Sequence, residues 1–377
     1  MKDFILNSSI EELILWGVLL LSFIIQLVYY LFIYSKVVSR KEATVKSDIT
    51  PVSVIICARN ESDNLSAHLP IILEQEYPSY EVVVVNDCSS DDTEDVLKHF
   101  SALYPHLRVT TIKEDEKFVH GKKLAMTVGI KAAKNEWLLF TDADCMPANR
   151  QWIATMQRNF TDDNQIVLGY GGYKPRKGFL NKLIRFDTFF IALQYMGFAL
   201  SKMPYMGVGR NLAYRKSLFL KNRGFASHSH IASGDDDLFV NEAAEGSFTG
   251  VELSGNAYTL SNPKTTYAAW DMQKKRHMST AKYYKSKHQY LLLLEPATRV
   301  LFFFLAVILA IISQFFYVAI GIFIIRLIIQ QIIFSKALKK FSEKNLLSLS
   351  ALFDLILPFI NLNLYTLNLF TKKNKWK

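Results

Sequence analysis

Carboxylate side chains occur at three places in the chain where their spacing could do chemistry. Asp142 and Asp144 are separated by one residue, Asp87 follows a run of valines, and an acidic triplet begins at Asp235. Two carboxylates on one tight turn can hold Mg²⁺ or Mn²⁺, and such an ion also binds phosphate oxygens. The alternative for Asp142 and Asp144 is that they only cap a turn at the end of a strand.

A glycine and a lysine, Gly121 and Lys122, precede a segment that is predicted to be helical as far as residue 134. The free N–H groups at the start of a helix, beside a lysine, suit a phosphate group. A solvated basic face of the helix is the alternative. The acidic triplet also has two interpretations, because one carboxylate could accept a proton from a reacting hydroxyl group or all three could cap a helix over residues 238–244.

The elements that must position these groups follow an alternating α/β pattern. Residues 52–57 and 82–85 are continuous β-branched runs, typical of strands buried on both faces of a sheet. Residues 137–141 form a further predicted strand, which ends directly in Asp142. Because open α/β sheets bind ligands at the carboxyl ends of their strands, we expect the carboxylates to meet at that edge of one domain.

Composition places part of the chain in lipid. Half of the residues (50%) are hydrophobic, more than soluble proteins usually carry, and the formal net charge is +10. The basic residues gather beside the apolar ends and form no stripe interleaved with aromatic residues, so no nucleic-acid partner is expected. The three cysteines form no C-x-x-C pair, which favours a reducing compartment over a disulfide framework or a zinc site.

An N-terminal anchor helix is predicted at residues 13–34, where Gln26 is the strongly polar residue. Acidic residues precede this segment and basic residues follow it without a small-residue cleavage site, so we expect an uncleaved anchor that ends in the cytosol. Residues 50–284 are then a cytosolic domain of an integral protein of the cell's inner membrane. Within this domain, residues 179–200 suit either a membrane interface or an ordinary core helix.

A C-terminal membrane region is predicted at residues 297–368. Its first part is too long for one span and should form a helical hairpin with a break near Ser313, in which Arg326 must snorkel or find a polar partner between helices. The last apolar stretch is interrupted by Asp354 among other polar residues, so spanning and re-entrant arrangements both stay open. The basic segment 264–288 before the hairpin favours the anionic, cytosolic leaflet.

Five motifs, taken in chain order, resemble those of family-2 glycosyltransferases with the GT-A fold. They are P-V-S-V-I-I-C-A-R-N-E from Pro51, V-V-V-V-N-D-C-S-S-D-D-T from Val82, F-T-D-A-D from Phe140, G-D-D-D from Gly234 and Q-K-K-R-H from Gln273. The last resembles the Q-x-x-R-W signature of membrane-bound synthases, with His277 in the position of tryptophan. The resemblance covers about residues 51–284.

This resemblance implies a Rossmann-like GT-A domain that binds a nucleotide-sugar donor, with UDP-sugars favoured, and a divalent ion. Asp144 and Asp142 are the expected ligands of Mg²⁺ or Mn²⁺. The residues expected at the nucleotide sugar are Ala58, Arg59, Glu61, Asp87, Lys122 and Asp142. Asp236 is expected to be the catalytic base, with Asp235 orienting the acceptor or metal-bound groups. Arg276, with Gln273 on the same helix face, should pair with the departing diphosphate.

The predicted activity is inverting transfer of a sugar to a lipid, a lipid-linked saccharide or a polysaccharide at the cytosolic membrane face, because one base and one displacement are proposed. His277 leaves processive and single transfer both open. A nucleotidyltransferase is the rival enzyme class, but residues 58–65 lack its glycine-rich, basic triphosphate loop. A non-catalytic membrane scaffold is the other alternative, and the intact Asp87, Asp144 and Asp236 argue against it. The sequence predicts no oligomeric state.

Overall fold

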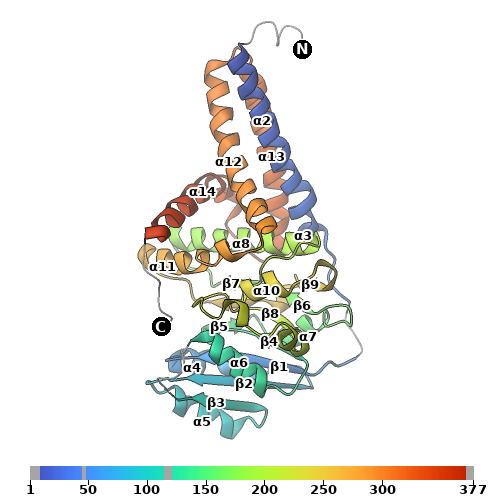
Figure 1. The fold of residues 1–377 in the computed structure, drawn as a ribbon, viewed down its shortest axis with the longest axis vertical. Coiled ribbons are helices and arrows are strands. Elements are labelled where there is room, and N and C mark those ends of the chain that lie inside the picture. The colour runs from blue at the N-terminus through green and yellow to red at the C-terminus, as the bar shows by residue number, and fades with distance from the viewer. Residues whose placement is uncertain (1–8, 45–47, 114–120, 371–377) are drawn as a thin grey trace.

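The computed structural model describes residues 9–44, 48–113 and 121–370. It consists of a mixed α/β body and a stalk of long helices that rises from one side of the body (Figure 1). The body lies between the N-terminal and C-terminal helices in the sequence, and these helices come together in the stalk.

A seven-stranded, mainly parallel sheet forms the centre of the body. Its strands are β1 (Val52–Ala58), β2 (Tyr80–Asp87), β3 (Leu107–Ile112), β4 (Trp137–Phe140), β6 (Ile166–Leu168), β8 (Leu212–Arg215) and β9 (Thr249–Val251). The order is β3-β2-β1-β4-β8-β6-β9, in which β3, β2, β1 and β4 are parallel and β8 is antiparallel to both of its neighbours. The parallel core confirms the α/β fold that the continuous apolar runs predicted.

Helices cover both faces of this sheet. They include α4 (Ser62–Leu73), α5 (Thr93–Leu103) and α7 (Trp152–Gln157) on one face and α6 (Lys122–Ala132) on the other. Successive side chains of β1 enter different cores: Ile56 packs with α4, and Ile55 packs with the core that contains α6. Because both faces are buried, β1 is apolar without alternation.

A small second sheet and several short helices lie beside the carboxyl ends of the parallel strands. The sheet has the order β5-β10-β7, with β5 (Cys145–Pro147), β7 (Gly171–Tyr173) and β10 (Thr259–Ser261). The helices are α9 (Lys216–Lys221), α10 (Asp237–Ala243), α11 (Tyr267–Met278) and the 3₁₀ turns η2 (Ala226–His228), η3 (Gly246–Phe248), η4 (Gly255–Ala257) and η5 (Ala281–Tyr283). β5 begins directly after Asp144, so this sheet fixes the acidic turn from its far side.

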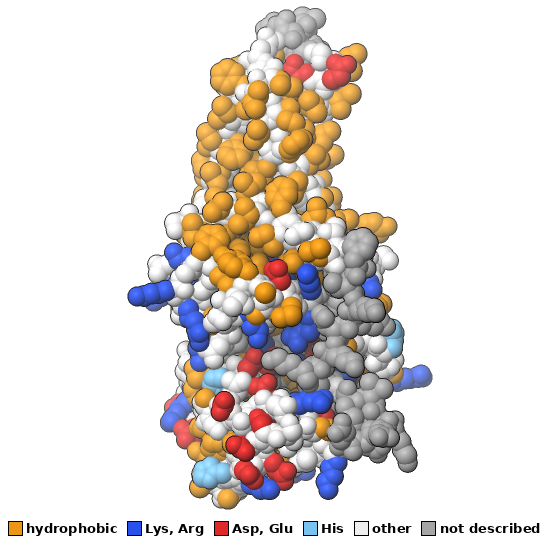
Figure 2. All heavy atoms as spheres, turned by 90° about the vertical axis from the view of Figure 1, so that its left-hand side faces the viewer, with side chains coloured by type: hydrophobic (Ala, Val, Ile, Leu, Met, Phe, Trp, Pro, Cys, Tyr) orange, Lys and Arg blue, Asp and Glu red, His pale blue; other side chains and the backbone are white. Residues whose placement is uncertain are grey.

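Three helices form the stalk. They are α2 (Ile10–Val28), α12 (Ser286–Ile312) and α13 (Phe316–Lys340), and α2 continues through the π-helix η1 (Tyr29–Tyr34) into α3 (Ser35–Ser39). All three are long and apolar enough to cross a membrane, and the stalk surface is mainly hydrophobic (Figure 2). The hairpin turns at Ser313, where the sequence predicted its break, but α12 begins earlier than expected, because the apolar run from Tyr290 extends it toward the body.

Two further apolar helices, α8 (Phe179–Leu200) and α14 (Leu347–Phe370), lie across the base of the stalk next to α11 (Figure 1). Both have the length and hydropathy of a membrane span. Most of α8 is buried inside the protein, in the same core as η1 and β8, so α8 is a core helix. α14 contacts α8, α11, α12 and α13 and does not run alongside the stalk.

A buried cluster of charged side chains joins α14 to the stalk. The Asp354 carboxylate accepts hydrogen bonds from Arg299 at 2.7 Å and from Arg326 at 2.9 Å. Arg299 also pairs with Glu295 at 2.6 Å, and Arg326 donates to Gln26 on α2 at 3.0 Å. Arg326 therefore has the polar partners that its place in an apolar helix requires.

Candidate active site

The ends of neighbouring parallel strands bring the first set of candidate residues together. Ala58 ends β1 and Asp87 ends β2, and both are fully buried. Asp142 and Asp144 lie on the turn between β4 and β5, where the N–H of Thr141 still donates to the Ile55 carbonyl of β1 at 3.3 Å. The predicted meeting at the carboxyl edge of the sheet is therefore a feature of this structure.

The loops after β1 and β2 are bonded to each other. The N–H of Ser90 donates to the Asn60 side chain at 2.8 Å, and the N–H of Ser62 donates to Asp91 at 3.1 Å. Burial raises the pKa of Asp91, but the bonds that it accepts from Thr93 and Ser62 outweigh this and lower it to about 2. These bonds fix the loop that carries the two remaining candidates for the nucleoside.

Those two candidates, Arg59 and Glu61, follow β1 directly. Both side chains are partly buried. The Glu61 carboxylate accepts from Asn64 at 2.5 Å at the start of α4, and the Glu61 N–H donates to Thr93 at the start of α5. Arg59 and Glu61 therefore lie just beyond the carboxyl end of β1.

Lys122 is the point where acids from different elements meet. Its ammonium group lies 2.8 Å from Asp142 and 3.0 Å from Asp235. Burial lowers the pKa of Lys122, but Asp142, Asp235 and Asp236 outweigh burial and raise it well above its ordinary value. Burial in turn raises the pKa of Asp142, and Lys122 outweighs it, so that the net shift is downward. Asp142 and Lys122 therefore both stay charged.

The structure gives the three acids of the triplet three different environments. Asp235 faces Lys122, whereas Asp236 accepts from the N–H of Gly209 at 2.6 Å and from the N–H of Asp237 at 2.7 Å. Asp237 turns away and accepts from Thr280 and from Tyr284, the latter at 2.7 Å. Burial, followed by the neighbouring Asp235 and Asp237, raises the pKa of Asp236 to about 7. A carboxylate with this pKa can exchange protons near neutrality.

Asp142, Asp144 and Cys145 form a group that fits a divalent ion. One ligand atom from each lies within 4.8 Å of the others. The Cys145 thiol donates to Asp144 at 3.3 Å, and burial raises its pKa well above the ordinary value, so Cys145 is a neutral thiol here. The two carboxylates supply the oxygen ligands that Mg²⁺ and Mn²⁺ prefer. Asp142 already pairs with one cation, the ammonium group of Lys122.

Helix α11 covers the site from the side of the membrane base. Gln273 donates to the Tyr173 hydroxyl at 3.1 Å, and Arg276 acts at longer range on Asp142, whose pKa it helps to lower. Lys274 points the other way and forms a buried ion pair with Asp187 of α8 at 2.5 Å. One basic residue of this motif therefore fixes the helix, while Arg276 acts electrostatically on Asp142.

A segment that the sequence analysis did not identify, residues 207–211, also lines the site. Gly209 donates to Asp236, and the guanidinium of Arg210 lies over the Tyr173 ring at 4.6 Å from its centre. Asn211 is fully buried and donates to the carbonyls of Tyr170 and Ala257. The available signal was a single arginine after two glycines, which is weak because no periodic pattern surrounds it.

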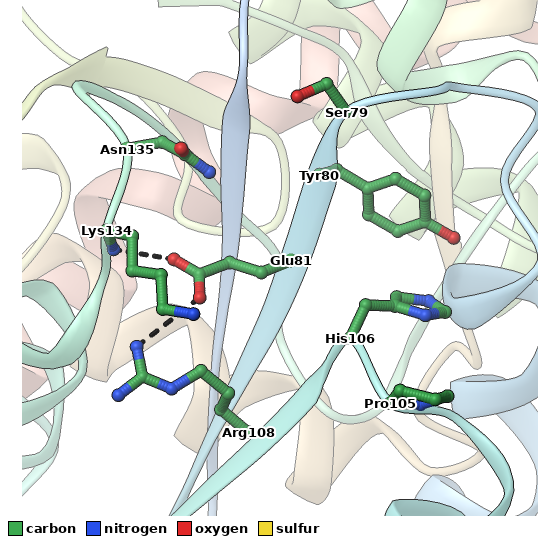
Figure 3. Close-up of a pocket in the computed structure, with 8 residues that line it drawn as sticks. All are labelled: Ser79, Tyr80, Glu81, Pro105, His106, Arg108, Lys134 and Asn135. Carbon is green, nitrogen blue, oxygen red and sulfur yellow. Dashed lines mark hydrogen bonds and ion pairs between the residues drawn. The ribbon is translucent and has the colours of Figure 1, made fainter.

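A polar hollow at the opposite edge of the sheet, about 270 Å³ in volume, is not connected with these acids (Figure 3). Its central carboxylate, Glu81, accepts from Ser53 at 2.7 Å and from the Lys134 N–H at 2.6 Å and faces Arg108 at 3.4 Å. Figure 3 shows the contacts of Glu81 with Lys134 and Arg108. Glu81 therefore ties neighbouring strands together.

The sheet order, the acidic turn after β4 and the small second sheet define a GT-A fold, the architecture of many nucleotide-sugar-dependent transferases. Among solved structures, a mannosyltransferase from Pyrobaculum calidifontis, determined with GDP-mannose and Mn²⁺, matches 91% of this chain and 98% of its own with a TM-score of 0.58. Sequence identity is 19%, so this likeness shows the fold.

Sequence comparison finds similarity to one family. Residues 53–222 match glycosyl transferase family 2. The glycosyltransferase AglE of Haloferax volcanii is 38% identical over 104 residues, which are 27% of this chain and 33% of that protein. A poly-beta-1,6-N-acetyl-D-glucosamine synthase of Staphylococcus epidermidis is 33% identical over 125 residues, 31% of this chain and 28% of the synthase. The family match covers less than half of the chain, and the chain spans a third or less of the length of these two relatives.

Proposed function

We propose that the protein is an inverting glycosyltransferase of a membrane surface, which uses a nucleoside diphosphate sugar, with UDP-sugars favoured. The observation that carries this proposal is the meeting of Asp142 and Asp235 at the ammonium group of Lys122, beside Asp236. The acceptor is a lipid, a lipid-linked saccharide or a polysaccharide. The candidate membrane spans of the stalk and a relative named poly-beta-1,6-N-acetyl-D-glucosamine synthase support this choice.

The donor side of the site is formed by residues at the ends of β1, β2 and β4. Asp142 and Asp144 would hold a divalent ion, which supplies positive charge to the diphosphate when it is bound. Asp87 and the backbone at Ala58 would bind the nucleoside, flanked by Arg59 and Glu61. Lys122 and Arg276 add cations beside the diphosphate, so that charge on the leaving group is stabilised as it develops.

Asp236 is the proposed base. Its carboxylate would take the proton of the acceptor hydroxyl as that oxygen attacks the anomeric carbon, and the bond from this carbon to the diphosphate oxygen breaks. The nucleoside diphosphate leaves with the bonding electron pair. One displacement inverts the anomeric centre. Asp235 would orient the acceptor or metal-bound groups through its contact with Lys122, and Gln273 would hold Tyr173 at the side of the sugar.

The orientation in the membrane belongs to the same proposal. α2, α12 and α13 would span the inner membrane, with the body and the basic segment 264–288 on the cytosolic side. α8 and α14 would lie at the level of the headgroups below the stalk. This arrangement places the site within reach of an acceptor whose lipid part stays in the bilayer.

Membranes that contain the protein, incubated with a panel of radiolabelled nucleotide sugars and divalent ions, test this proposal. The expected result is label transferred from one donor to a lipid-extractable or polymeric product, with loss of transfer in the Asp236→Asn variant. Release of labelled pyrophosphate from a nucleoside triphosphate would instead identify a nucleotidyltransferase. Donor binding without any transfer would identify a scaffold.

A further inference from the structure

Arg210 occupies a fixed position between the donor and acceptor sides of the site. On one side of it in the chain, Gly209 donates to Asp236 at 2.6 Å. On the other, Asn211 is buried and bonded to the Tyr170 and Ala257 carbonyls at 2.9 and 2.6 Å. The backbone of Arg210 is therefore held by both neighbours, and its side chain starts from a defined point.

The side chain of Arg210 is also held in a defined direction. Its guanidinium lies over the ring of Tyr173, whose hydroxyl accepts from Gln273 at 3.1 Å. A Cβ atom at Gly171 would lie only 3.0 Å from the Arg210 Cβ and 3.2 Å from its Nε, so a glycine is needed there to make room. Stacking on an aromatic face leaves the edge of the guanidinium, with its N–H groups, turned toward other ligands.

One of these N–H groups has hydrogen-bonding capacity that the protein leaves unused. Arg210 Nη1 is buried and has no hydrogen-bond partner among the described residues. A buried charged donor without a partner is costly, which favours a ligand that supplies one. Burial lowers the pKa of Arg210, but Tyr173 and Cys145, followed by Asp142 and Asp144, outweigh burial and raise it. Neither of these two carboxylates makes an ion pair with Arg210 within 4.0 Å in the described part of the chain.

We propose that Arg210 binds the sugar-bearing phosphate of the nucleoside diphosphate donor and stabilises it as the leaving group. This inference rests on the proposed function. Asp142 and Asp144, which would hold the metal-bound diphosphate, act electrostatically on this guanidinium. Its planar fork suits phosphate oxygens, with which it can form two parallel bonds. Lys122 pairs with Asp142 and Asp235 and so adds positive charge beside the diphosphate, whereas Arg210 Nη1 has no hydrogen-bond partner among the described residues and can donate to a phosphate oxygen.

Binding of two ligands that differ by one phosphate group, UDP and UMP, tests this inference. UDP retains the phosphate that carries the sugar, whereas UMP lacks it, and both retain the nucleoside. We expect Arg210→Gln to weaken UDP binding by about 10- to 100-fold, the usual effect of losing a hydrogen bond to a charged group, and to leave UMP binding within about twofold. Arg210→Lys, which keeps the charge and loses the fork, should give an intermediate result.

Calorimetry of the full-length protein in detergent with Mn²⁺ makes this measurement, with GDP and GMP titrated in parallel. Arg150→Gln is the matched control, because Arg150 is exposed and pairs with Glu74 away from the site. Should Arg210→Gln fail to fold, Tyr173→Leu tests the same contact by removing the stacking surface, and it should also weaken UDP selectively.

The outcomes separate this inference from the proposed function. Equal losses for UDP and UMP, or no loss for either, would overturn the assignment of Arg210 while the wild-type protein still binds UDP. A rise in the KM for the acceptor with unchanged UDP affinity would place Arg210 on the acceptor side and overturn it too. A wild-type protein that binds neither diphosphate would overturn the proposed function itself.

Discussion

Two groups of charged side chains, one at the base of the stalk and one at the edge of the sheet, are built on opposite principles. At the base, Asp354 accepts from both Arg299 and Arg326, and Glu295 pairs with Arg299. Two guanidinium groups and two carboxylates balance in charge. Such a cluster is suited to holding helices together in lipid, where an unpaired charge is costly.

The acids at the edge of the sheet are not balanced in this way. Lys122 faces both Asp142 and Asp235, while Asp236 makes no ion pair within 4.0 Å among the described residues. Its pKa is raised to about 7, chiefly by burial. An excess of carboxylates with one perturbed pKa is typical of a site prepared for a cation and a proton transfer. Charge balance therefore distinguishes the cluster at the base of the stalk from the acids at the edge of the sheet.

The largest expected effect comes from Asp236→Asn. Removing the base should lower kcat by at least about 100-fold and by as much as 10⁴-fold. The unfolding temperature should stay the same or rise, because the variant removes a buried carboxylate next to Asp235 and Asp237. Transfer assays and thermal unfolding in detergent measure the two effects. Near-normal turnover would place the base elsewhere and would remove the contrast between the two clusters.

The next effect concerns the base of the stalk. Asp354→Ala leaves Arg299 and Arg326 buried without their shared partner, which should reduce the free energy of unfolding by about 3–5 kcal/mol. UDP affinity of the protein that remains folded should not change. Asp162→Ala is the matched control, because the Asp162 side chain is fully exposed and lies 3.7 Å from Arg215. Equal unfolding temperatures for the two variants would show that the cluster contributes little to stability.

A smaller effect is expected on the pH dependence of transfer. The base must be ionised, so kcat/KM should rise with pH up to about 7, the pKa of Asp236 in the free protein, and level off above it. Asp237→Asn removes a negative neighbour, so the pKa of Asp236 should fall and the acid limb of the profile should move roughly one unit lower. An unchanged profile, in a variant that unfolds normally, would mean that another group sets it.

The sequence predicted the parts of this fold that local patterns encode. β1, β2 and β4 are continuous apolar runs that end in polar residues, and the direction of parallel strands puts those ends at one edge of the sheet. The turn with Asp142 and Asp144 follows from the same logic. Family resemblance then pointed to Asp236, and the structure shows why its two acidic neighbours differ from it: Asp235 faces Lys122, and Asp237 bonds to Tyr284.

Features that depend on contacts between distant elements were not predictable. Nothing local indicates that Lys122 would join Asp142 to Asp235, or that Arg210 would stack on Tyr173. Residues 207–211 have no periodicity, so their place in the site follows only from tertiary packing. The same holds for α14, whose position across the base is fixed by the pairing of Asp354 with two other helices.

The proposed function depends on the binding of a divalent ion, together with a diphosphate, by carboxylates at the carboxyl edge of the sheet. Titrating UDP into the wild-type protein and the Asp144→Ala variant, each with Mn²⁺ and with EDTA, tests it most directly. We expect UDP binding by the wild-type protein to require Mn²⁺, and we expect the variant to lose the Mn²⁺-dependent part of its affinity for UDP. Metal-independent binding by the wild type, or equal Mn²⁺-dependent binding by the variant, would contradict it.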